Sequence, residues 1–271
     1  MPLTPADKRA NFRKLHEKGC FIIPNPFDAG TAKALQHLGF KAVASTSAGF
    51  AWTIGKADNR VTVDDVCDHL SALCEAVDIP VNADFEGGFA VEPEGVGSNV
   101  ARAVKTGVAG LSIEDSTGDK DKPLFESNLA IGRIKAARKA IDADNSGVLL
   151  TGRCEAFLWG VTDLKLVIER LQAYSAAGAD CLYAPGIRTS EDISAVVKAV
   201  HPKPVNLLVS APVLSVDQAE ELGVRRISVG GSLARNAWAG FMKAAKEMAE
   251  QGTFTDLAHG YCGGELNKMF R

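Results

Sequence analysis

The sequence lacks several features that would assign it to a familiar class of protein. Its 271 residues carry a formal net charge of −3, so it has no excess of basic residues with which a general nucleic-acid surface neutralises phosphates. No apolar run approaches the roughly 20 residues that span a bilayer, and residues 1–11 lack the apolar stretch of a signal peptide. We therefore expect a cytoplasmic protein that binds neither nucleic acid nor membrane.

Cysteine and histidine offer little catalytic or metal-binding chemistry. The six cysteines include no Cys-x-x-Cys pair, which excludes the common spacings of zinc and redox sites. The five histidines fall in or beside helical segments or in the C-terminal tail, so none is an evident catalytic base. No linker, low-complexity segment or block of five charges interrupts the chain, and its hydrophobic fraction of 46% is enough for a large core. We expect residues 1–271 to form a single domain.

What the chain does have is a regular alternation of two kinds of segment. Runs rich in β-branched and apolar residues predict eight strands, at 20–24, 42–46, 81–85, 110–114, 148–153, 181–184, 205–209 and 226–229. Apolar residues at helical spacing follow the runs, at 29–38, 63–77, 94–106, 129–142, 162–177, 190–200, 215–222 and 234–251. Because such crossovers join parallel strands and bury both faces of the sheet, the pattern predicts an α/β protein, a closed (β/α)8 TIM barrel.

The main alternative is a doubly wound open sheet. That fold favours a glycine-rich phosphate turn after the first strand, whereas the turn here reads Asn-Pro-Phe-Asp at residues 25–28. Asp28 and Thr62 are placed to cap the helices that follow them. We also expect an extra helix before Cys20 and an irregular tail over residues 252–271 that packs on the barrel or on a neighbouring subunit.

Acidic side chains gather at the ends of the predicted third and fourth strands. Asn82, Asp84 and Glu86 alternate along the third strand, so the period of two places them on one face, and Glu114 ends the fourth strand. The chemistry of a barrel lies at the carboxyl ends of its strands. Carboxylates that converge there repel one another unless a cation lies between them, and hard oxygen ligands suit Mg²⁺ or Mn²⁺. For any single acid, helix capping or pairing with a lysine is an open alternative.

The ends of the second and fifth strands supply groups that can bind an anion. Arg153 suits a bidentate contact with a carboxylate or phosphonate; an ion pair with Glu155 or Glu114 is an alternative, and the two are compatible. Residues 45–49, Ser-Thr-Ser-Ala-Gly, offer hydroxyls and backbone N–H groups to a substrate carboxylate. Asp58 lies on the long connection to the next helix, where a solvated loop acid is the alternative to a role in the site.

Six short motifs resemble, in the same order, those of the isocitrate lyase/phosphoenolpyruvate mutase superfamily, and the similarity covers nearly the whole chain. The motifs are Asn-Pro-Phe-Asp-Ala from Asn25, the turn at 45–49, Gly-x-x-Asp ending at Asp58, Asn-Ala-Asp-x-Glu-Gly-Gly from Asn82, Ser-Ile-Glu-Asp ending at Asp115, and Arg-x-Glu from Arg153.

This resemblance implies a Mg²⁺-dependent barrel, with Mn²⁺ as a possible substitute. Asp84 would bind the metal directly, while Asn82 and Glu114 would reach it through water. The last helix of such proteins is often exchanged between subunits, so the resemblance also implies a homodimer or homotetramer.

The resemblance implies roles for the remaining site residues as well. Asp58 would lie near the metal and the reacting bond, and Arg153 would hold the acid group of a small carboxylic acid substrate. Ser45, Thr46 and Ser47 would bind the substrate carboxylate.

The chain also departs from its relatives. Lyases such as the isocitrate and methylisocitrate enzymes have a Lys-x-Cys-Gly-His loop after the fourth strand, and its cysteine donates a proton, whereas residues 115–123 here contain neither cysteine nor histidine. Many members have Asp where this chain has Asn82. At 228–232 the chain reads Ser-Val-Gly-Gly-Ser, where several members have an Asn-His pair.

We expect a Mg²⁺-dependent lyase that cleaves a C–C bond of a small 2-oxo or 2-hydroxy (di)carboxylic acid through an enolate-like intermediate. Oxaloacetate decarboxylation is one candidate, because it requires no thiol to protonate a carbanion on a fixed face. Phosphonomutase-type P–C bond chemistry, with Arg153 and a loop lysine such as Lys120 on the phosphonate, is an alternative. A barrel that binds an oxo acid without transforming it is a second alternative.

Overall fold

The computed structural model describes residues 2–212 and 214–270 and contains one eight-stranded parallel sheet, in the order β1-β8-β7-β6-β5-β4-β3-β2. From β2 to β8 each strand pairs with the next along the chain, and β8 pairs with β1, as in a (β/α)8 TIM barrel; all eight predicted strands are confirmed. Their bounds are β1 Phe21–Ile23, β2 Val43–Ala44, β3 Val81–Asp84, β4 Gly110–Glu114, β5 Leu149–Arg153, β6 Cys181–Tyr183, β7 Val205–Leu208 and β8 Arg226–Ser228.

Asn25 helps to close the barrel between β1 and β2, which are the two ends of the strand order. The backbone N–H of Ala44 donates to the carbonyl oxygen of Pro24 at 3.0 Å, which joins β2 to the end of β1. The Asn25 amide donates to the Ser45 carbonyl at 2.9 Å, and its oxygen accepts from the N–H groups of Val229 and Gly230, both at 2.9 Å. One buried side chain therefore ties together the carboxyl ends of β1, β2 and β8.

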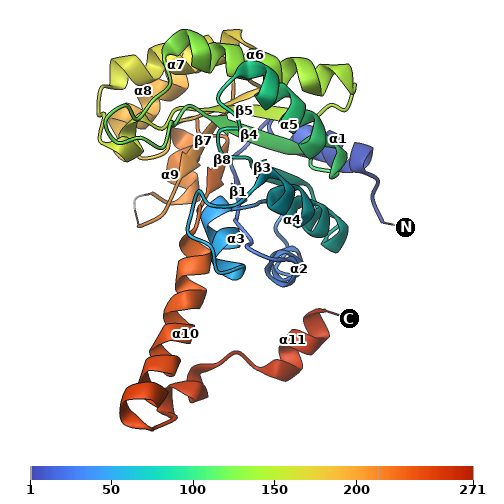
Figure 1. The fold of residues 1–271 in the computed structure, drawn as a ribbon, viewed down its shortest axis with the longest axis vertical. Coiled ribbons are helices and arrows are strands. Elements are labelled where there is room, and N and C mark those ends of the chain that lie inside the picture. The colour runs from blue at the N-terminus through green and yellow to red at the C-terminus, as the bar shows by residue number, and fades with distance from the viewer. Residues whose placement is uncertain (1, 213, 271) are drawn as a thin grey trace.

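The helices lie around the strands, and the predicted ones are present (Figure 1). Asp28 and Thr62 form the capping boxes of α2 and α4, as expected. Leu70 and Leu73 of α4 are fully buried, so its apolar face packs onto the sheet. The bounds are α1 Pro5–Leu15, α2 Ala29–His37, α4 Val63–Ala76, α5 Pro93–Lys105, α6 Ser127–Ala143, α7 Leu164–Ala176, α8 Ser190–Val200, α9 Val216–Glu221 and α10 Ser232–Gln251, with the short η1 Ala156–Trp159 after β5.

Two segments are more helical than the sequence indicated. The Ser-Thr-Ser-Ala-Gly segment, predicted as a turn, opens α3 (Ser47–Thr53), whose N-cap is Thr46. Its small residues lack an apolar period long enough to predict a helix. The tail, expected to be irregular, contains η2 (Thr255–His259) and α11 (Gly263–Met269).

Helix α10 projects away from the barrel, and the segment after it returns toward α2 (Figure 1). Apolar side chains that a helix would normally bury are exposed along α10: Trp238, Phe241, Met242 and Met248. We call residues 232–270 the C-terminal arm. The rest of the arm leaves these apolar side chains exposed. Exposed apolar surface of this kind is typical of a segment that packs against another chain. No helix in the described ranges is long and apolar enough to cross a membrane.

The register of the strands brings the polar strand ends together. Glu114 of β4 is the direct neighbour of Arg153 of β5, and Asp84 of β3 is the neighbour of Ser112 of β4. Gly152 allows close packing behind them, since a Cβ there would lie 2.8 Å from the Cβ of Tyr174 in α7. The carboxyl ends of β3, β4 and β5 therefore share one short stretch of the barrel rim.

Candidate active site

A pocket of about 220 Å³ opens at the carboxyl ends of the strands. Most of the residues predicted for the site line it, namely Ser45, Thr46, Ser47, Asp58, Asn82, Asp84 and Arg153. Glu114 does not line the pocket, but its carboxylate lies directly behind Arg153. The strand ends thus bring the predicted residues together.

Arg153 is the centre of the acidic cluster. Its Nη1 lies 3.2 Å from Asp84 Oδ1 and 3.3 Å from Glu114 Oε2, and its Nε donates to Glu155 Oε1. The guanidinium also lies 5.3 Å from the centre of the Tyr183 ring. Burial lowers the pKa of Arg153, but Glu155, Glu114 and Asp84 outweigh burial and hold the pKa well above its ordinary value. The predicted pairing with Glu155 and Glu114 is therefore present, and it holds the guanidinium in place.

Residues from the second strand hold Asp84 from the opposite side. The backbone N–H and the hydroxyl of Ser47 both donate to Asp84 Oδ2 at 3.0 Å, and the hydroxyl of Ser45 accepts from the Asp84 N–H at 2.9 Å. Thr46 accepts from the Gly49 N–H at 3.3 Å, as the cap of α3. Binding of a substrate carboxylate by these three residues stays a prediction. In the structure, Ser45 and Ser47 orient Asp84, whereas Thr46 caps α3.

More carboxylates than cationic side chains lie at this rim of the barrel. Burial, together with Glu155, Asp84 and Glu86, raises the pKa of Glu114 well above its ordinary value despite Arg153. Burial and the charges of Asp84 and Asp58 raise the pKa of Glu86 to about 8. Partial burial and Asp84 also raise the pKa of Asp58. Each raised pKa means that the surroundings of the carboxylate stabilise its negative form poorly.

Glu86 is placed in this crowded position by an uncommon backbone conformation. Strand β3 ends at Asp84, and Glu86 turns away with φ 45°, in the left-handed region that favours glycine. Its Oε1 is buried and has no hydrogen-bond partner among the described residues. Asn59, next to Asp58, is also left-handed, with φ 61°. Such conformations cost on the order of 1–3 kcal/mol and cluster at functional sites.

The donor set fits a hard divalent cation. The carboxylates of Asp84, Glu114 and Glu155 contact one arginine, and a buried oxygen of the nearby Glu86 has no hydrogen-bond partner among the described residues. In the described ranges, no three Asp, Glu, His or Cys side chains converge tightly enough to hold a metal by themselves. A cation here would therefore be bound by few carboxylate oxygens and keep several waters, as Mg²⁺ does.

Asn82 is less well placed for a role at the cation. Its side chain is nearly fully buried, and its Oδ1 has no hydrogen-bond partner among the described residues. That oxygen lies near β4, 2.6 Å from the position that a Cβ on Gly110 would take. Contact of Asn82 with a metal through water stays a prediction, because the Asn82 amide would have to rotate to make that contact.

A buried network behind the rim fixes Glu155. Asp115 Oδ1 accepts from the Glu155 N–H at 2.8 Å, and Asp115 Oδ2 accepts from the Tyr174 hydroxyl at 2.6 Å and from Arg170 Nη1 at 3.1 Å. Arg170 also donates to the carbonyl of Phe125 at 2.9 Å. Helix α7 therefore holds the ends of β4 and β5 in position relative to each other.

The loop after β4 is folded as a short hairpin beside the pocket. The N–H of Thr117 donates to the Pro123 carbonyl at 2.9 Å, and Ser116 pairs with Leu124 in an antiparallel bridge. The indole of Trp159 donates to the Ser116 hydroxyl at 3.0 Å. The segment that distinguishes this chain from cysteine-bearing lyases is thus anchored to η1, next to the site.

The other half of the pocket was not predicted. Tyr183, Asn206, Ser228 and Arg226 from β6, β7 and β8 line it, together with Leu158, and Arg235 of α10 lies at its edge. Tyr183 and Ser228 lie at the carboxyl ends of β6 and β8, where a polar residue is a signal for a site, whereas Asn206 and Arg226 lie nearer the amino ends of β7 and β8. Arg235 follows the last strand by several residues, so no pattern in the sequence places it at the pocket.

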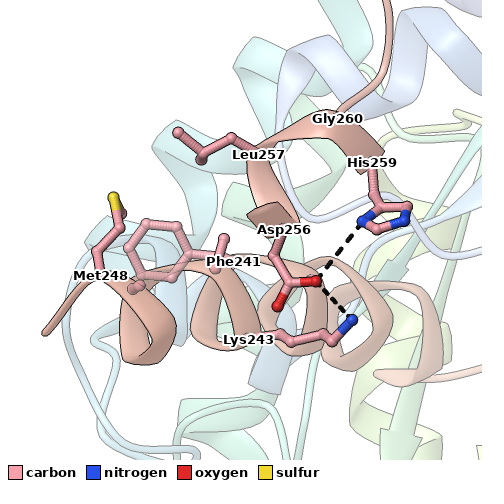
Figure 2. A pocket seen from close by; sticks show the side chains of 10 residues that line it. Phe241, Lys243, Met248, Asp256, Leu257, His259 and Gly260 are labelled. Carbon is pink, nitrogen blue, oxygen red and sulfur yellow. Dashed lines mark hydrogen bonds and ion pairs between the residues drawn. The ribbon is translucent and has the colours of Figure 1, made fainter. Parts of the chain in front are cut away.

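A second hollow lies in the C-terminal arm, between α10 and η2 (Figure 2). Phe241, Met248 and Leu257 give it an apolar wall. Lys243 lies 2.7 Å and His259 3.6 Å from Asp256 Oδ1, so the charges at its edge are already paired. An apolar wall with paired charges at its edge is typical of a surface that packs against another protein segment.

Comparisons with known proteins find similar sequences and similar structures. A sequence model of the phosphoenolpyruvate phosphomutase family matches residues 12–249. A crystal structure from Burkholderia cenocepacia J2315, described as a lyase or mutase, is 45% identical with a TM-score of 0.93, over 98% of this chain and 96% of that one. A second structure from that organism, described as a phosphonomutase, is 31% identical with a TM-score of 0.83, over 92% of this chain and all of that one.

Among characterised sequences, the chain is similar to an oxaloacetate decarboxylase. The protein from Paraburkholderia xenovorans (strain LB400) is 29% identical over 240 residues, which cover 83% of this chain and 76% of that protein. The relatives thus bear names from both lyase and phosphonate chemistry.

The crowding of carboxylates predicts an unusual pH dependence of stability. Glu86 has a pKa of about 8 in the folded protein and an ordinary value of 4.5, so the folded state binds the proton more tightly between these values. In chelator-treated protein, the free energy of unfolding should therefore fall as pH rises from about 4.5 to about 8. Glu86→Gln should reduce this slope, as measured by denaturant unfolding at a series of pH values.

Glu94→Gln, at an exposed position in the first turn of α5, is the matched control and should keep the slope of the unmodified protein. An equal slope in the Glu86→Gln variant would contradict the placement of Glu86 among uncompensated acids.

Proposed function

Because the chain belongs to the phosphoenolpyruvate phosphomutase family, within the isocitrate lyase/phosphoenolpyruvate mutase superfamily, we propose that it is a Mg²⁺-dependent lyase that cleaves a C–C bond of a small 2-oxo or 2-hydroxy dicarboxylic acid. The relatives are lyases and mutases, so the chain is an enzyme of this superfamily. The observation that carries the proposal is the group of Asp84, Glu114 and Glu155 around Arg153 at the pocket.

Some residues of the rim would bind the metal, and others would bind the substrate. Asp84 would bind Mg²⁺ directly, Glu114 would hold its water, and Asn82 would do so after a turn of its amide. Bound Mg²⁺ would supply a Lewis acid for the 2-oxo and carboxylate oxygens of the substrate. Arg153 would donate to the acid group of the substrate, and Ser45, Thr46 and Ser47 would bind its carboxylate with hydroxyl and backbone N–H groups.

Decarboxylation of oxaloacetate is the concrete reaction that these residues suit. The bond between C3 and C4 breaks, CO₂ leaves, and the electron pair passes into the 2-oxo group. Asp58 lines the pocket and has a raised pKa, so it is placed to return a proton to C3. The nearest thiol, Cys154, is fully buried and burial raises its pKa, so it does not replace the cysteine acid of other lyases.

Phosphonate chemistry is the second candidate, favoured by the similarity to the structure described as a phosphonomutase. The loop lysines would have to assist Arg153 on the phosphonate. Lys122 lies 3.6 Å from Glu126, which leaves Lys120 as the loop lysine for this role. Lys120 does not line the pocket, so we rank this reaction second.

We further propose a homodimer or homotetramer in which the C-terminal arm packs against a partner subunit. Exposed Trp238, Phe241 and Met242 on α10 support it, as does the apolar hollow beside η2 (Figure 2). Light scattering of the purified protein should give at least twice the chain mass of 28.6 kDa, and Phe241→Asp should lower the mass. A monomer at micromolar concentration would contradict this assembly.

Turnover tests the proposed reaction. With Mg²⁺, the enzyme should form product from at least one acid in a panel of 2-oxo and 2-hydroxy dicarboxylic acids, oxaloacetate included, as followed by mass spectrometry. Asp84→Asn should lower kcat/KM by on the order of 10²-fold or more, because the negative ligand is lost. Asp78→Asn, in the exposed bend before the same strand, is the control and should leave kcat/KM unchanged.

Two outcomes would contradict the C–C lyase. One is turnover of phosphonopyruvate alone, detected by phosphorus NMR. The other is saturable binding of oxo acids without any product, which would identify a binding protein.

A further inference from the structure

Asp58 lines the pocket although no strand carries it. It belongs to the connection between α3 and α4, and most residues of this connection are exposed. Within the described ranges, the Asp58 carboxylate accepts a single hydrogen bond, at 3.0 Å, from the backbone N–H of its neighbour Asn59. The position of this carboxylate in the pocket therefore depends on how the connection itself is fixed.

The connection is anchored at both of its ends. The N–H of Lys56 donates to the carbonyl oxygen of Ala51 at 2.9 Å, so the chain turns back on the end of α3. Gly55, with φ 68°, allows this turn because its conformation is left-handed. At the other end, the Val61 side chain is buried in the hydrophobic core. Asp58 lies between these two anchors.

The Lys56 side chain adds a contact from the connection to the helix that follows it. Its Nζ donates to Asp65 Oδ2 at 2.6 Å, and Asp65 lies in the first turn of α4. The same oxygen accepts from the backbone N–H and the hydroxyl of Thr62, both at 2.8 Å. The hydrogen bond from Lys56, followed by those from Thr62, lowers the pKa of Asp65 to about 2, so this carboxylate stays charged at neutral pH.

The effect of this ion pair is expected to be local. The Lys56 and Asp65 side chains are 37% and 29% exposed, and an ion pair at such a surface contributes little to the stability of a whole domain. An exposed connection, however, is mobile unless specific contacts hold it. Lys56 precedes Asp58 by two residues, so the pair restrains the part of the connection that carries the Asp58 carboxyl.

We propose that Lys56 is a positioning residue that holds Asp58 at the reacting carbon through its ion pair with Asp65. The inference rests on the proposed function, in which the Asp58 carboxyl donates its proton to C3 of the enolate. In that step the O–H bond of Asp58 breaks and a C–H bond forms at C3 with the electron pair of the enolate. Asp58 is left as a carboxylate, which regains a proton from water. Because proton transfer requires the acid within reach of C3, a displaced connection would slow this step more than it weakens ligand binding.

Two measurements, both with MgCl₂ present, separate the proton transfer from binding. Exchange of the C3 hydrogens of pyruvate for deuterium in D₂O, followed by proton NMR, reports the proposed step in both directions. Calorimetric titration with oxalate, which has no C3, reports binding alone.

The variants are Lys56→Met, which removes the charge, Lys56→Arg, which keeps it, Asp58→Asn, and Lys165→Met as the control. Lys165 lies 3.9 Å from Glu169, and both side chains are largely exposed on α7. Replacing Lys165 therefore removes a surface lysine–carboxylate pair far along the chain from Asp58. Helix α4 should stay folded in Lys56→Met, since the contacts between Thr62 and Asp65 remain.

Lys56→Met should lower the rate constant of exchange by on the order of 10-fold to 100-fold, as expected for a small displacement of a reacting group. The Kd of oxalate and the midpoint of denaturant unfolding should not change. Lys56→Arg should restore most of the rate, because it keeps a charged donor for Asp65. Asp58→Asn should lose at least as much rate as Lys56→Met, and Lys165→Met should match the unmodified protein in every measurement.

The outcomes separate this inference from the proposed function. If the unmodified protein exchanges the C3 hydrogens and Lys56→Met does so equally fast, the role of Lys56 is overturned alone. A loss of oxalate affinity as large as the loss of exchange rate also overturns it, since Lys56 would then act on the whole site. Undiminished exchange in Asp58→Asn would overturn the step that Lys56 serves. If the unmodified protein exchanges no C3 hydrogens, the proposed decarboxylation fails and this inference fails with it.

Discussion

Arg153 lies among the carboxylates of Asp84, Glu114 and Glu155, and the rest of the site depends on this contact. Parallel strands with a common direction deliver these groups to one rim, and one guanidinium offsets only part of their charge. The remaining negative charge is visible in the raised pKa values of Glu114 and Glu86. A hard divalent cation would offset this imbalance, and for that reason we propose that the rim binds one.

The barrel supports this cluster through contacts outside the pocket. Asn25 ties β1, β2 and β8 together at the same rim, and Asp115 connects Glu155 to α7. The opposite side of the pocket carries no carboxylate from β6, β7 or β8, and Arg235 lies at its edge. The carboxylates that line the pocket therefore lie on one side of it, whereas β6, β7 and β8 supply neutral groups and Arg226.

Much of the fold was predictable because strands and helices alternate with clear punctuation, as at the capping residues Asp28 and Thr62. The acidic strand ends were predictable because a charge at the end of a buried strand needs a partner. Helix α3 was not, since its small residues have no apolar period. Arg235 was missed because its place at the pocket depends on how the chain turns after β8, a tertiary feature that local sequence does not specify.

The central claim is that the rim of carboxylates around Arg153 binds a divalent cation through Asp84. The most direct measurement is titration with Mn²⁺, followed by electron paramagnetic resonance of the free ion. We expect saturable binding that Mg²⁺ competes away and that Asp84→Asn abolishes. Absence of binding in the unmodified protein, or equal binding in the Asp84→Asn variant, would contradict it.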